Sequence, residues 1–407
     1  MDKRLPLEGV TVIELATVVA APVTGRLLSD FGARVIKIET PPDGDLLRSS
    51  AGAYYFPEEE DNSPFFDAFN AGKKLIALNL KEPEGRELFE KLLADADVFL
   101  TNVRMRSLKK MELGYETLHE RFPELIYAHF SGYGLNGPEA EAPGFDVTAF
   151  WMRSGAMLDT LLPGSYPLRP TYAMGDMATA SAFFAGILMA LYARKCGGHG
   201  TMVSSSLLNA GIWYNTAFVM NAQPQYGRTF PLERHDPHDP FSDYYQCADG
   251  EWVGVIEKVY QKDRFVFADV FDMPELVSDP ALESLEAMRR SGRLSEVSGK
   301  VEAKMRTKSS AEWLAILSKR DVPAERIRHF REVSKDPQAW ANGYLEKVSY
   351  PDGAETAIPT PPICFSDYGR KSFEKRGPVG MDTEEVLGSL GCDRERIESL
   401  RKRGVVK

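Results

Sequence analysis

The sequence has few of the features that mark disulfide-linked, metal-binding or membrane proteins. Its four cysteines, at positions 196, 247, 364 and 392 of 407 residues, include no Cys-x-x-Cys pair. That spacing indicates neither a disulfide framework nor a zinc site. The six histidines fall in no ligand spacing either, and we expect no bound metal. Because the chain has no signal-peptide core and no run of about 18 uncharged apolar residues, we expect a cytoplasmic protein without a membrane-spanning helix.

An excess of positive charge is also missing. Forty-nine Lys and Arg residues against 59 Asp and Glu residues give a net charge of −10, so the average surface repels nucleic acid and anionic lipid. The first strand-to-helix turn lacks Gly-x-Gly-x-x-Gly, and no phosphate-loop, Gly-x-Ser-x-Gly or His-Glu-x-x-His motif occurs. These absences disfavour NAD binding, phosphate-loop nucleotide binding, nucleophile-elbow hydrolysis and zinc proteolysis.

Strand and helix patterns alternate from the start of the chain. Residues 10–15 and 34–39 predict strands, and a helix between them should begin at Pro22 and end before Gly32. Such alternation predicts an α/β fold with a parallel sheet, whose ligands gather at the carboxyl ends of the strands. Further strands and helices are expected at 75–80, 83–94, 98–101, 125–130, 176–193, 201–204 and 207–222.

The length predicts two domains. Residues 1–210 carry the α/β pattern, and the stretch rich in Pro and His near 231–240 marks 211–240 as a linker. Residues 241–320 should form a smaller α+β domain that begins with a hairpin across Asp249-Gly250. Residues 321–407 return to short strands and turns, with a terminal helix at 383–390.

Basic and amide side chains gather at the predicted strand ends, where they could form a local phosphate-binding pocket. Each alone is more often a solvated surface residue. Asp176 is a separate feature, because it follows Gly175 and precedes small residues at a predicted helix start. Capping of that helix is the common role of such an aspartate. A carboxylate with so little steric protection could also attack an electrophile. The basic and amide set is Lys37, Arg48, Lys73, Lys74, Asn102, Arg104 and Lys110.

Taken together, the motifs resemble those of the class III CoA-transferases over nearly the whole chain. Within that family, Gly144 to Phe150 and Asp336 to Leu345 are most similar to the 2-hydroxyacyl-CoA transferases of amino-acid fermentation, especially the aryllactate type. The family motifs are Leu7 to Val10, Val12 to Leu15, Phe31 to Glu39, Gly44-Asp45, Asn70 to Lys73, Asp97 to Asn102, Ser131 to Gly134, Gly144 to Asp146, Gly175-Asp176 and Gly198 to Gly200.

The resemblance implies an interlocked homodimer whose Rossmann-like large domain is built from both chain ends. It implies transfer of CoA from an acyl-CoA donor such as cinnamoyl-CoA to a 2-hydroxy acid such as (R)-phenyllactate, with Asp176 as the nucleophile that becomes an aspartyl-CoA thioester. By position, the CoA groove would contain Val19, Ala20, Lys73, Asn102, Val103, Arg104 and Lys110, and the substrate pocket Phe145, Asp146, Phe150 and Trp151. The substrate class suggests functional coupling to a 2-hydroxyacyl-CoA dehydratase.

Three alternatives remain beside this interpretation. The α-methylacyl-CoA racemases share the fold, but they carry a catalytic His where this chain has Phe145, which cannot abstract a proton. Another carboxylic acid could be the acceptor, although Val19 replaces the Gln of formyl-CoA transferases and their Gly-rich lid is absent after Ala222. A CoA-binding protein without activity would also keep the fold, and the intact Asp176 argues against it.

Overall fold

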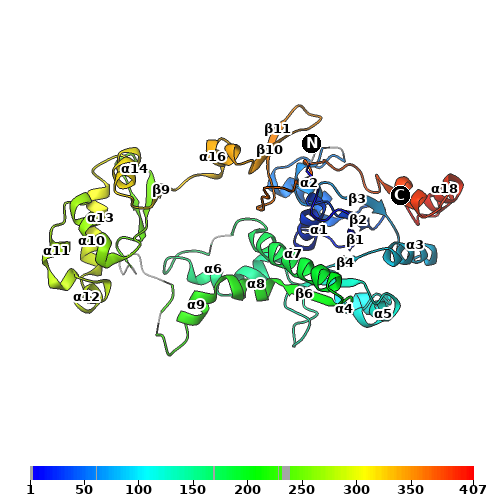
Figure 1. Ribbon diagram of the computed structural model, residues 1–407, viewed down its shortest axis with the longest axis horizontal. Helices are drawn as coiled ribbons and strands as arrows, with labels where there is room; N and C mark the ends of the chain where they lie inside the picture. The colour runs from blue at the N-terminus through cyan, green and yellow to red at the C-terminus, as the bar shows by residue number, and fades with distance from the viewer. Residues whose placement is uncertain (1–2, 61, 168–169, 228, 232–238) are drawn as a thin grey trace. The chain divides into compact units, whose positions relative to one another are not determined.

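The computed structural model describes residues 3–60, 62–167, 170–227, 229–231 and 239–407, with its elements labelled in Figure 1. The larger of its two units contains Met1–Met157, Leu168–Tyr226 and Gln338–Lys407, and the smaller contains Leu158–Pro167 and Gly227–Pro337. These bounds differ from the expected ones of 210, 241 and 321. The larger unit continues past residue 210 because its helices α8 and α9 follow the sheet directly, and the smaller one extends to 337 because it holds a third strand.

A six-stranded sheet of parallel strands forms the centre of the larger unit. Its order is β3-β2-β1-β4-β5-β6, so the direction of strand succession reverses between β1 and β4. A doubly wound sheet opens its ligand crevice at the carboxyl ends of such a pair. The predicted parallel α/β sheet is therefore confirmed. The strands are β1 (Thr11–Leu15), β2 (Arg34–Glu39), β3 (Lys74–Ala77), β4 (Val98–Thr101), β5 (Ile126–Ser131) and β6 (Met202–Ser206).

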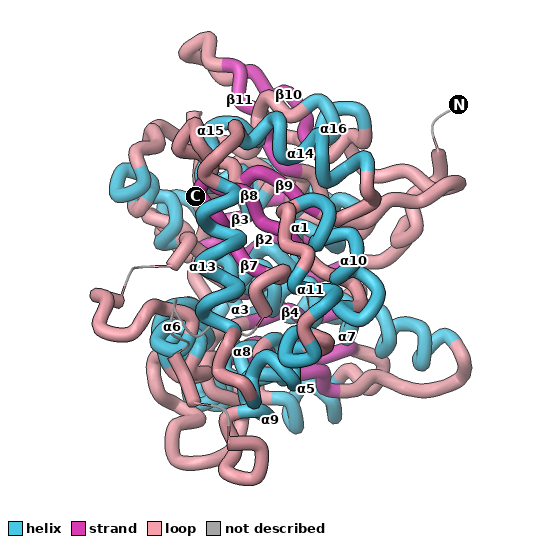
Figure 2. Tube along the Cα trace, turned by 90° about the vertical axis from the view of Figure 1, so that its left-hand side faces the viewer, coloured by secondary structure: helices cyan, strands magenta, loops and turns pink. Residues whose placement is uncertain are grey.

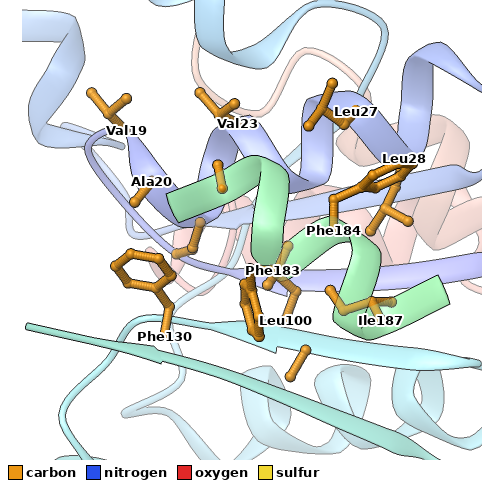
Figure 3. Close-up of a cluster of buried hydrophobic side chains, with 14 of the residues drawn as sticks. Val19, Ala20, Val23, Leu27, Leu28, Leu100, Phe130, Phe183, Phe184 and Ile187 are labelled. Carbon is orange, nitrogen blue, oxygen red and sulfur yellow. The ribbon is translucent and has the colours of Figure 1, made fainter. Parts of the chain in front are cut away.

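Alternate residues of these strands bury themselves on opposite faces of the sheet, as the period of two requires. Val12 and Leu100 belong to the core shared with α1 (Ala20–Asp30) and α7 (Met174–Lys195), whose apolar side chains interlock in Figure 3. Ile13 and its neighbours face the opposite core. The helices of that core are α3 (Pro83–Ala94), α4 (Met105–Lys110), α5 (Tyr115–Arg121), α17 (Thr383–Ser389) and α18 (Arg394–Lys402).

The helix α7 is long and apolar enough to cross a membrane by length and composition alone. It packs against α1, α8, β5 and β6, and its buried residues include Phe183 and Ile187. One face of α7 is therefore part of the core of the larger unit. Its other face carries exposed apolar side chains, including Met189 and Tyr192.

Several predicted element bounds need correction. Helix α1 begins at Ala20, not Pro22, because a proline is tolerated anywhere in the first turn, where the N–H groups have no helical acceptor. The expected single helix at 207–222 is two, α8 (Leu207–Tyr214) and α9 (Thr216–Asn221), since the Asn215 side chain donates to Gly211 O and ends the first. Helix α18 was not predicted, although Asp393 caps its start by accepting from the Arg396 N–H.

The smaller unit is α+β. Its sheet is antiparallel with order β7-β8-β9, and β7 and β8 form the predicted hairpin. Phe241, Phe267 and Trp313 are fully or almost fully buried in its core. Figure 2 distinguishes helices from strands. The elements are β7 (Asp243–Gln246), β8 (Trp252–Val255), α10 (Tyr260–Val270), α11 (Glu275–Ser278), α12 (Leu285–Arg290), α13 (Leu294–Met305), α14 (Ser310–Lys319), β9 (Ala324–Arg326) and α15 (Phe330–Val333).

The larger unit has several shorter elements besides the sheet and its helices. The strands β10 and β11 form an antiparallel pair after the smaller unit. A π-helix, η3, follows the Gly144-Phe145 segment. The bounds are η1 (Leu46–Ser49), η2 (Ala51–Tyr54), α2 (Pro64–Asn70), η3 (Asp146–Met152), α6 (Ala156–Asp159), α16 (Pro337–Ala341), β10 (Leu345–Ser349) and β11 (Glu355–Pro359).

Four buried charges link the first strands of the sheet, and we call them the buried ion network: Glu14, Lys37, Asp45 and Lys73. Lys37 Nζ lies 3.0 Å from a Glu14 carboxylate oxygen and 2.8 Å from Asp45 Oδ2. Lys73 Nζ lies 2.8 Å from the other Glu14 oxygen. Two ammonium groups thus balance two carboxylates, which is the condition for keeping charges in an interior.

Gly25 of α1 lies directly on this network. Because glycine has no side chain, the helix can approach the Glu14 carboxylate closely. A Cβ at Gly25 would lie 1.9 Å from Glu14 Oε2. This carboxylate cannot move away easily, because Lys73 Nζ lies 2.8 Å from Oε2 and Lys37 Nζ lies 3.0 Å from Oε1. We predict that Gly25→Ala lowers the free energy of unfolding by about 1–3 kcal/mol, despite the higher helix propensity of alanine. Urea denaturation measures this. Gly299 of α13 meets no atom within 4 Å, so Gly299→Ala should instead gain about 0.5–1 kcal/mol. Equal effects would contradict the account.

Candidate active site

Two adjoining hollows open at the carboxyl ends of β1, β4 and β5, where the strand order reverses. The first, which we call the Asp176 pocket, has a volume of about 90 Å³. The second, the outer pocket, has about 300 Å³ and shares Val18, Asn102 and Phe145 with the first. This is the position that the sheet topology favours for a ligand. The Asp176 pocket is lined by Val18, Val19, Ala20, Asn102, Phe130, Ser131, Gly132, Gly144, Phe145, Asp176 and Leu207.

Asp176 lies in the first turn of α7 and is 8% exposed. Its backbone N–H donates to Asp146 Oδ1 over 2.8 Å. Because the residue before the helix, Ala173, offers no capping side chain, Asp146 supplies the acceptor from a segment 30 residues earlier. Gly175 permits this approach, since a Cβ there would lie 2.4 Å from Phe150 Cγ and 2.5 Å from Asp146 Oδ1. Asp176 therefore does not cap its helix, the common role of such a residue.

The carboxyl group of Asp176 is held in a poorly solvated position. Burial raises its pKa to about 8, and the neighbouring Asp146 carboxylate contributes to the rise. Burial also raises the pKa of Asp146, against the opposing effect of the N–H groups of Asp176 and Gly175 that it accepts. Among the described residues, no hydrogen-bond donor reaches the Asp176 carboxylate. An ionised carboxylate with so few partners is a stronger nucleophile than a solvated one.

The wall formed by the start of α1 has an unusual backbone. Val18 has φ of +70°, a region that β-branched residues seldom adopt. The Asn102 side chain braces the preceding residue, because its Oδ1 accepts the Thr17 N–H over 3.1 Å and its Nδ2 donates to Thr17 O over 2.8 Å. Both amide groups of Asn102 are thus used to shape the wall of the pocket.

Four residues predicted for the CoA groove line these pockets. Val19, Ala20 and Asn102 line the Asp176 pocket, and Arg104 lines the outer pocket. Lys73 lies elsewhere: it is fully buried, and its ammonium donates to Glu14, Pro22 O and Asn70 Oδ1. Such an ammonium is a structural cation of the core, because its hydrogen bonds are already used.

Val103 and Lys110 line neither pocket. The Val103 carbonyl bonds to His129 Nε2 over 2.9 Å, and Lys110 is exposed at the end of α4. The structure thus brings together four of the seven predicted groove residues and leaves three outside the two hollows.

The four residues predicted for the substrate pocket have different surroundings. Phe145 is 60% exposed and lines both hollows, whereas Asp146 is buried against the start of α7. Phe150 is buried behind Gly175, and its ring packs edge-on against Trp151 with centroids 5.5 Å apart. Phe150 and Trp151 therefore support the site from the core and line neither hollow.

Ser131 and Gly132 belong to a family motif and to the loop after a predicted strand, and both line the two hollows. A Cβ at Gly132 would lie 2.7 Å from the Gly144 Cα, so two glycines let two loops cross beside the pocket. Leu207 comes from the start of α8. Nothing in the local sequence indicates that it reaches Asp176.

No group of three His, Cys, Asp or Glu residues that could hold a metal ion occurs in the part of the chain that the structure describes. Arg104 is the basic residue of the predicted groove that lines the outer pocket. The groups that the two hollows bring together include the Asp176 carboxylate, the Arg104 guanidinium, and His129 and Glu141 of the outer pocket.

The raised pKa of Asp176 predicts a stability cost that depends on pH. The unfolded carboxyl group ionises near 3.8 and the folded one near about 8, so in that window the folded chain binds more protons and loses stability as pH rises. We expect Asp176→Asn to raise the melting temperature by an amount that grows from pH 4 to 8 and then levels off. Calorimetry over this range measures it. Asp272→Asn, at a side chain 85% exposed, is the control, and an equal gain there would contradict the prediction.

Known proteins can now be compared with this site. A sequence profile described as CoA-transferase family III matches residues 7–383. The chain is 35% identical to the (R)-2-hydroxy-4-methylpentanoate CoA-transferase of Clostridioides difficile, over 98% of this chain and 99% of that protein. It is 36% identical to the cinnamoyl-CoA:phenyllactate CoA-transferase of Clostridium sporogenes, over 97% of this chain and 95% of that protein.

A solved structure gives the same result. A CAIB/BAIF family protein from Brucella suis matches with a TM-score of 0.77 at 28% identity, covering 95% of this chain and 100% of that one. The family resemblance read from the motifs is confirmed by the profile and by both relatives. The chain therefore belongs to CoA-transferase family III, and it is a CoA-transferase.

Proposed function

We propose that this enzyme moves CoA from an acyl-CoA to a small 2-hydroxy carboxylate through a covalent intermediate on Asp176. The observation that carries the proposal is the placement of Asp176, a buried carboxylate of raised pKa that lines a pocket and receives no hydrogen bond from the described residues. A thioester carbonyl bound in that pocket would meet the carboxylate directly. Nucleophilic catalysis by Asp is a common way to divide one difficult transfer into easier steps.

The proposed reaction proceeds through two anhydrides. One Asp176 oxygen attacks the thioester carbonyl of the donor, the C–S bond breaks, and an acyl-aspartyl anhydride and CoA thiolate form. The thiolate then attacks the Asp176 carbonyl, releasing the donor acid and leaving an aspartyl-CoA thioester. The acceptor carboxylate attacks that thioester to form a second anhydride, and the thiolate takes the new acyl group. The Asp176 carboxylate is regenerated. Because burial raises the pKa of this group to about 8, it has to lose its proton before the first attack, and the exchange steps themselves then transfer none.

The energetics of this sequence fit the pocket. One thioester is broken and another is formed, so the exchange needs no nucleotide hydrolysis. The anhydrides are sensitive to water, which makes exclusion of water the main requirement on the protein. A pocket of about 90 Å³ with an aspartate that is 8% exposed supports that requirement. N–H groups at the start of α1 can donate hydrogen bonds to the attacked carbonyl oxygen and stabilise the negative charge that develops on it.

For the acyl groups, we propose an aryllactate such as (R)-phenyllactate as acceptor and a donor like cinnamoyl-CoA. Val19, Phe130, Phe145 and Leu207 give the Asp176 pocket apolar contacts beside its polar residues, and such contacts suit a hydrocarbon group. Both relatives at 35% and 36% identity are named for 2-hydroxy acids with such groups, a branched alkyl and an aryl group. The enzyme would then act in cytoplasmic amino-acid fermentation, and a 2-hydroxyacyl-CoA dehydratase would consume its product.

For CoA, we propose that Val19, Ala20, Asn102 and Arg104 form the groove. Val19 and Ala20 line the Asp176 pocket, and Asn102 lines both hollows. Arg104 supplies a cation that can bind a phosphate in a chain of net charge −10. Lys110 and the Val103 backbone lie on the same segment and could contact the nucleotide beyond the outer pocket. We assign no CoA contact to Lys73, whose ammonium is fully used in the core.

We propose that the enzyme is an interlocked homodimer, as the family resemblance implies. Large apolar side chains remain exposed along α7 and α8, including Met189 at 68%, Tyr192 at 71% and Trp213 at 71%. Contiguous exposed apolar side chains of this kind mark protein interfaces. Sedimentation of the full chain measures the oligomeric state.

Racemisation is not favoured by the site. An α-methylacyl-CoA racemase needs a group that moves a proton where Phe145 stands, and the Phe145 ring lines the pocket at that position. Asp176 alone would serve either reaction. An acyl-CoA with a hydrogen isotope at its α-carbon separates the two activities, because racemisation exchanges that hydrogen and CoA transfer does not.

The nucleophilic role of Asp176 is tested with the Asp176→Ala variant. We expect transfer to be abolished while affinity for CoA changes by less than about tenfold, because the carboxylate acts in the chemistry and not in nucleotide binding. In the wild-type enzyme, cinnamoyl-CoA followed by hydroxylamine should inactivate and leave a mass change on the Asp176 peptide. Asp272→Ala is a matched control on the surface. Transfer by Asp176→Ala at a rate near that of the wild type would refute the assignment.

The acyl specificity is tested with one labelled aryl-acyl-CoA and a panel of carboxylic acids, read by mass spectrometry. We expect kcat/KM to be highest for (R)-phenyllactate, because the apolar side chains of the pocket favour an aryl group and a difference of one methylene in an apolar pocket changes kcat/KM by about 10–200-fold. A preference for (R)-2-hydroxy-4-methylpentanoate would place the enzyme with the branched-chain relative. A preference for oxalate, carnitine or succinate would contradict the proposal.

A further inference from the structure

The turn that leads from β1 into α1 has one residue in a strained conformation, and that residue belongs to the Asp176 pocket. Val18 lies at φ +70° and lines both hollows. In this left-handed region the Cβ of an ordinary residue crowds its own backbone, and a β-branched side chain makes the crowding worse. Such a conformation persists only when its surroundings over-determine it.

Asp45 supplies the contact that fixes Val18 directly. Its Oδ1 accepts the Val18 N–H over 2.9 Å and the Leu47 N–H over 3.0 Å. Its Oδ2 lies 2.8 Å from Lys37 Nζ. The Asp45 side chain is 1% exposed, so solvent does not compete for these bonds. Burial alone would raise the pKa of Asp45, but the Lys37 ammonium and the N–H groups of Leu47 and Val18 bring it below its usual value.

Lys37 holds the same turn from the other side. Its ammonium donates to Ala16 O over 2.7 Å, and it is itself held by Glu14 at 3.0 Å. Asn102 fixes Thr17, which lies between Ala16 and Val18, by accepting the Thr17 N–H and donating to the Thr17 carbonyl. The three successive residues Ala16, Thr17 and Val18 are therefore each bonded to a side chain from elsewhere in the fold. That arrangement determines the direction in which the chain enters α1.

We propose that Asp45 is a positioning residue for the transfer reaction, holding the Val18 turn so that the start of α1 faces the reacting carbonyl at Asp176. This inference rests on the proposed function of Asp176. The Asp45 side chain does not line the Asp176 pocket. It acts on the pocket through its hydrogen bond from the Val18 N–H. The buried ion network therefore also affects the site, because the Lys37 ammonium keeps the Asp45 carboxylate in one orientation.

The test compares Asp45→Asn with the double variant Val18→Gly/Asp45→Asn. The amide keeps the size of the side chain but loses the charge that pairs with Lys37, so the turn relaxes. We expect kcat to fall by about 10–100-fold with KM for the acyl-CoA within about threefold, because small misplacement is costly in the chemical step. Glycine adopts positive φ freely, so the double variant should recover about fivefold in kcat over Asp45→Asn.

The matched control is Asp67→Asn. Asp67 is equally buried, accepting the Arg376 N–H at 2.7 Å and the Tyr350 hydroxyl at 3.1 Å, and it lines neither hollow. It should lower the melting temperature and leave kcat within about twofold. Should Asp45→Asn not fold, Asp45→Glu provides the second variant, since it keeps a carboxylate to pair with Lys37 but moves that carboxylate away from the position that accepts the Val18 N–H. We expect it to lose at least about tenfold in kcat.

Two readouts separate this proposal from the function beneath it. If the wild-type enzyme forms no adduct on Asp176 with cinnamoyl-CoA, the proposed function fails regardless of the variants. If the wild type forms the adduct and Asp45→Asn matches Asp67→Asn in kcat, the positioning role is overturned and the function stands. A double variant that recovers no activity, or an Asp45→Glu enzyme within about threefold of wild type, also overturns it. Recovery by glycine supports it, because a role in stability alone gives no reason for such recovery.

Discussion

The unsolvated carboxylate at position 176 is the constraint on which the site depends. A helix start ordinarily stabilises an anion through its free N–H groups. Here Asp146 takes the N–H of Asp176, so that stabilisation goes to a different carboxylate. Burial and the neighbouring Asp146 carboxylate raise the pKa of Asp176 to about 8. The fold thus keeps a reactive group at a cost in stability, which is the usual trade at catalytic positions.

Small residues make that placement sterically feasible. Gly175 lets Asp146 and Phe150 approach the start of α7, and Gly132 with Gly144 lets two loops cross at the edge of the pocket. Gly25 plays the same part further along α1, where that helix lies on the buried ion network. The pocket therefore lies between two helices that both come closer to charged groups than helices with ordinary side chains could. Both helices belong to one core, in which Phe183 and Phe184 of α7 pack among Val23 and Leu28 of α1 (Figure 3).

Much of the fold could be predicted from local pattern. The strand at 98–101 and the helix at 83–94 have the bounds that their periodicity indicates. Apolar residues recur at every second position of a half-buried strand and at every third or fourth position of a helix, so the sequence itself indicates which residues are buried. The site was harder. The cap of α7 comes from Asp146, and spacing within the helix carries no sign of it. Lys73 looks like a ligand-binding cation at a strand end, and only the space left by Gly25 and the charge of Glu14 explain why it is buried. The family motifs supplied Asp176, and the geometry supplies the physical reason for its reactivity.

The central claim is that an oxygen of Asp176 becomes bonded to the acyl carbon in every turnover. It is tested most directly with an acceptor acid labelled with heavy oxygen in its carboxylate. In the proposed sequence, the acceptor leaves one of its oxygens on Asp176 when the thiolate removes the acyl group. The account predicts heavy oxygen in the Asp176 peptide after turnover and, with further cycles, in the released donor acid. Turnover that leaves this peptide unlabelled would contradict it.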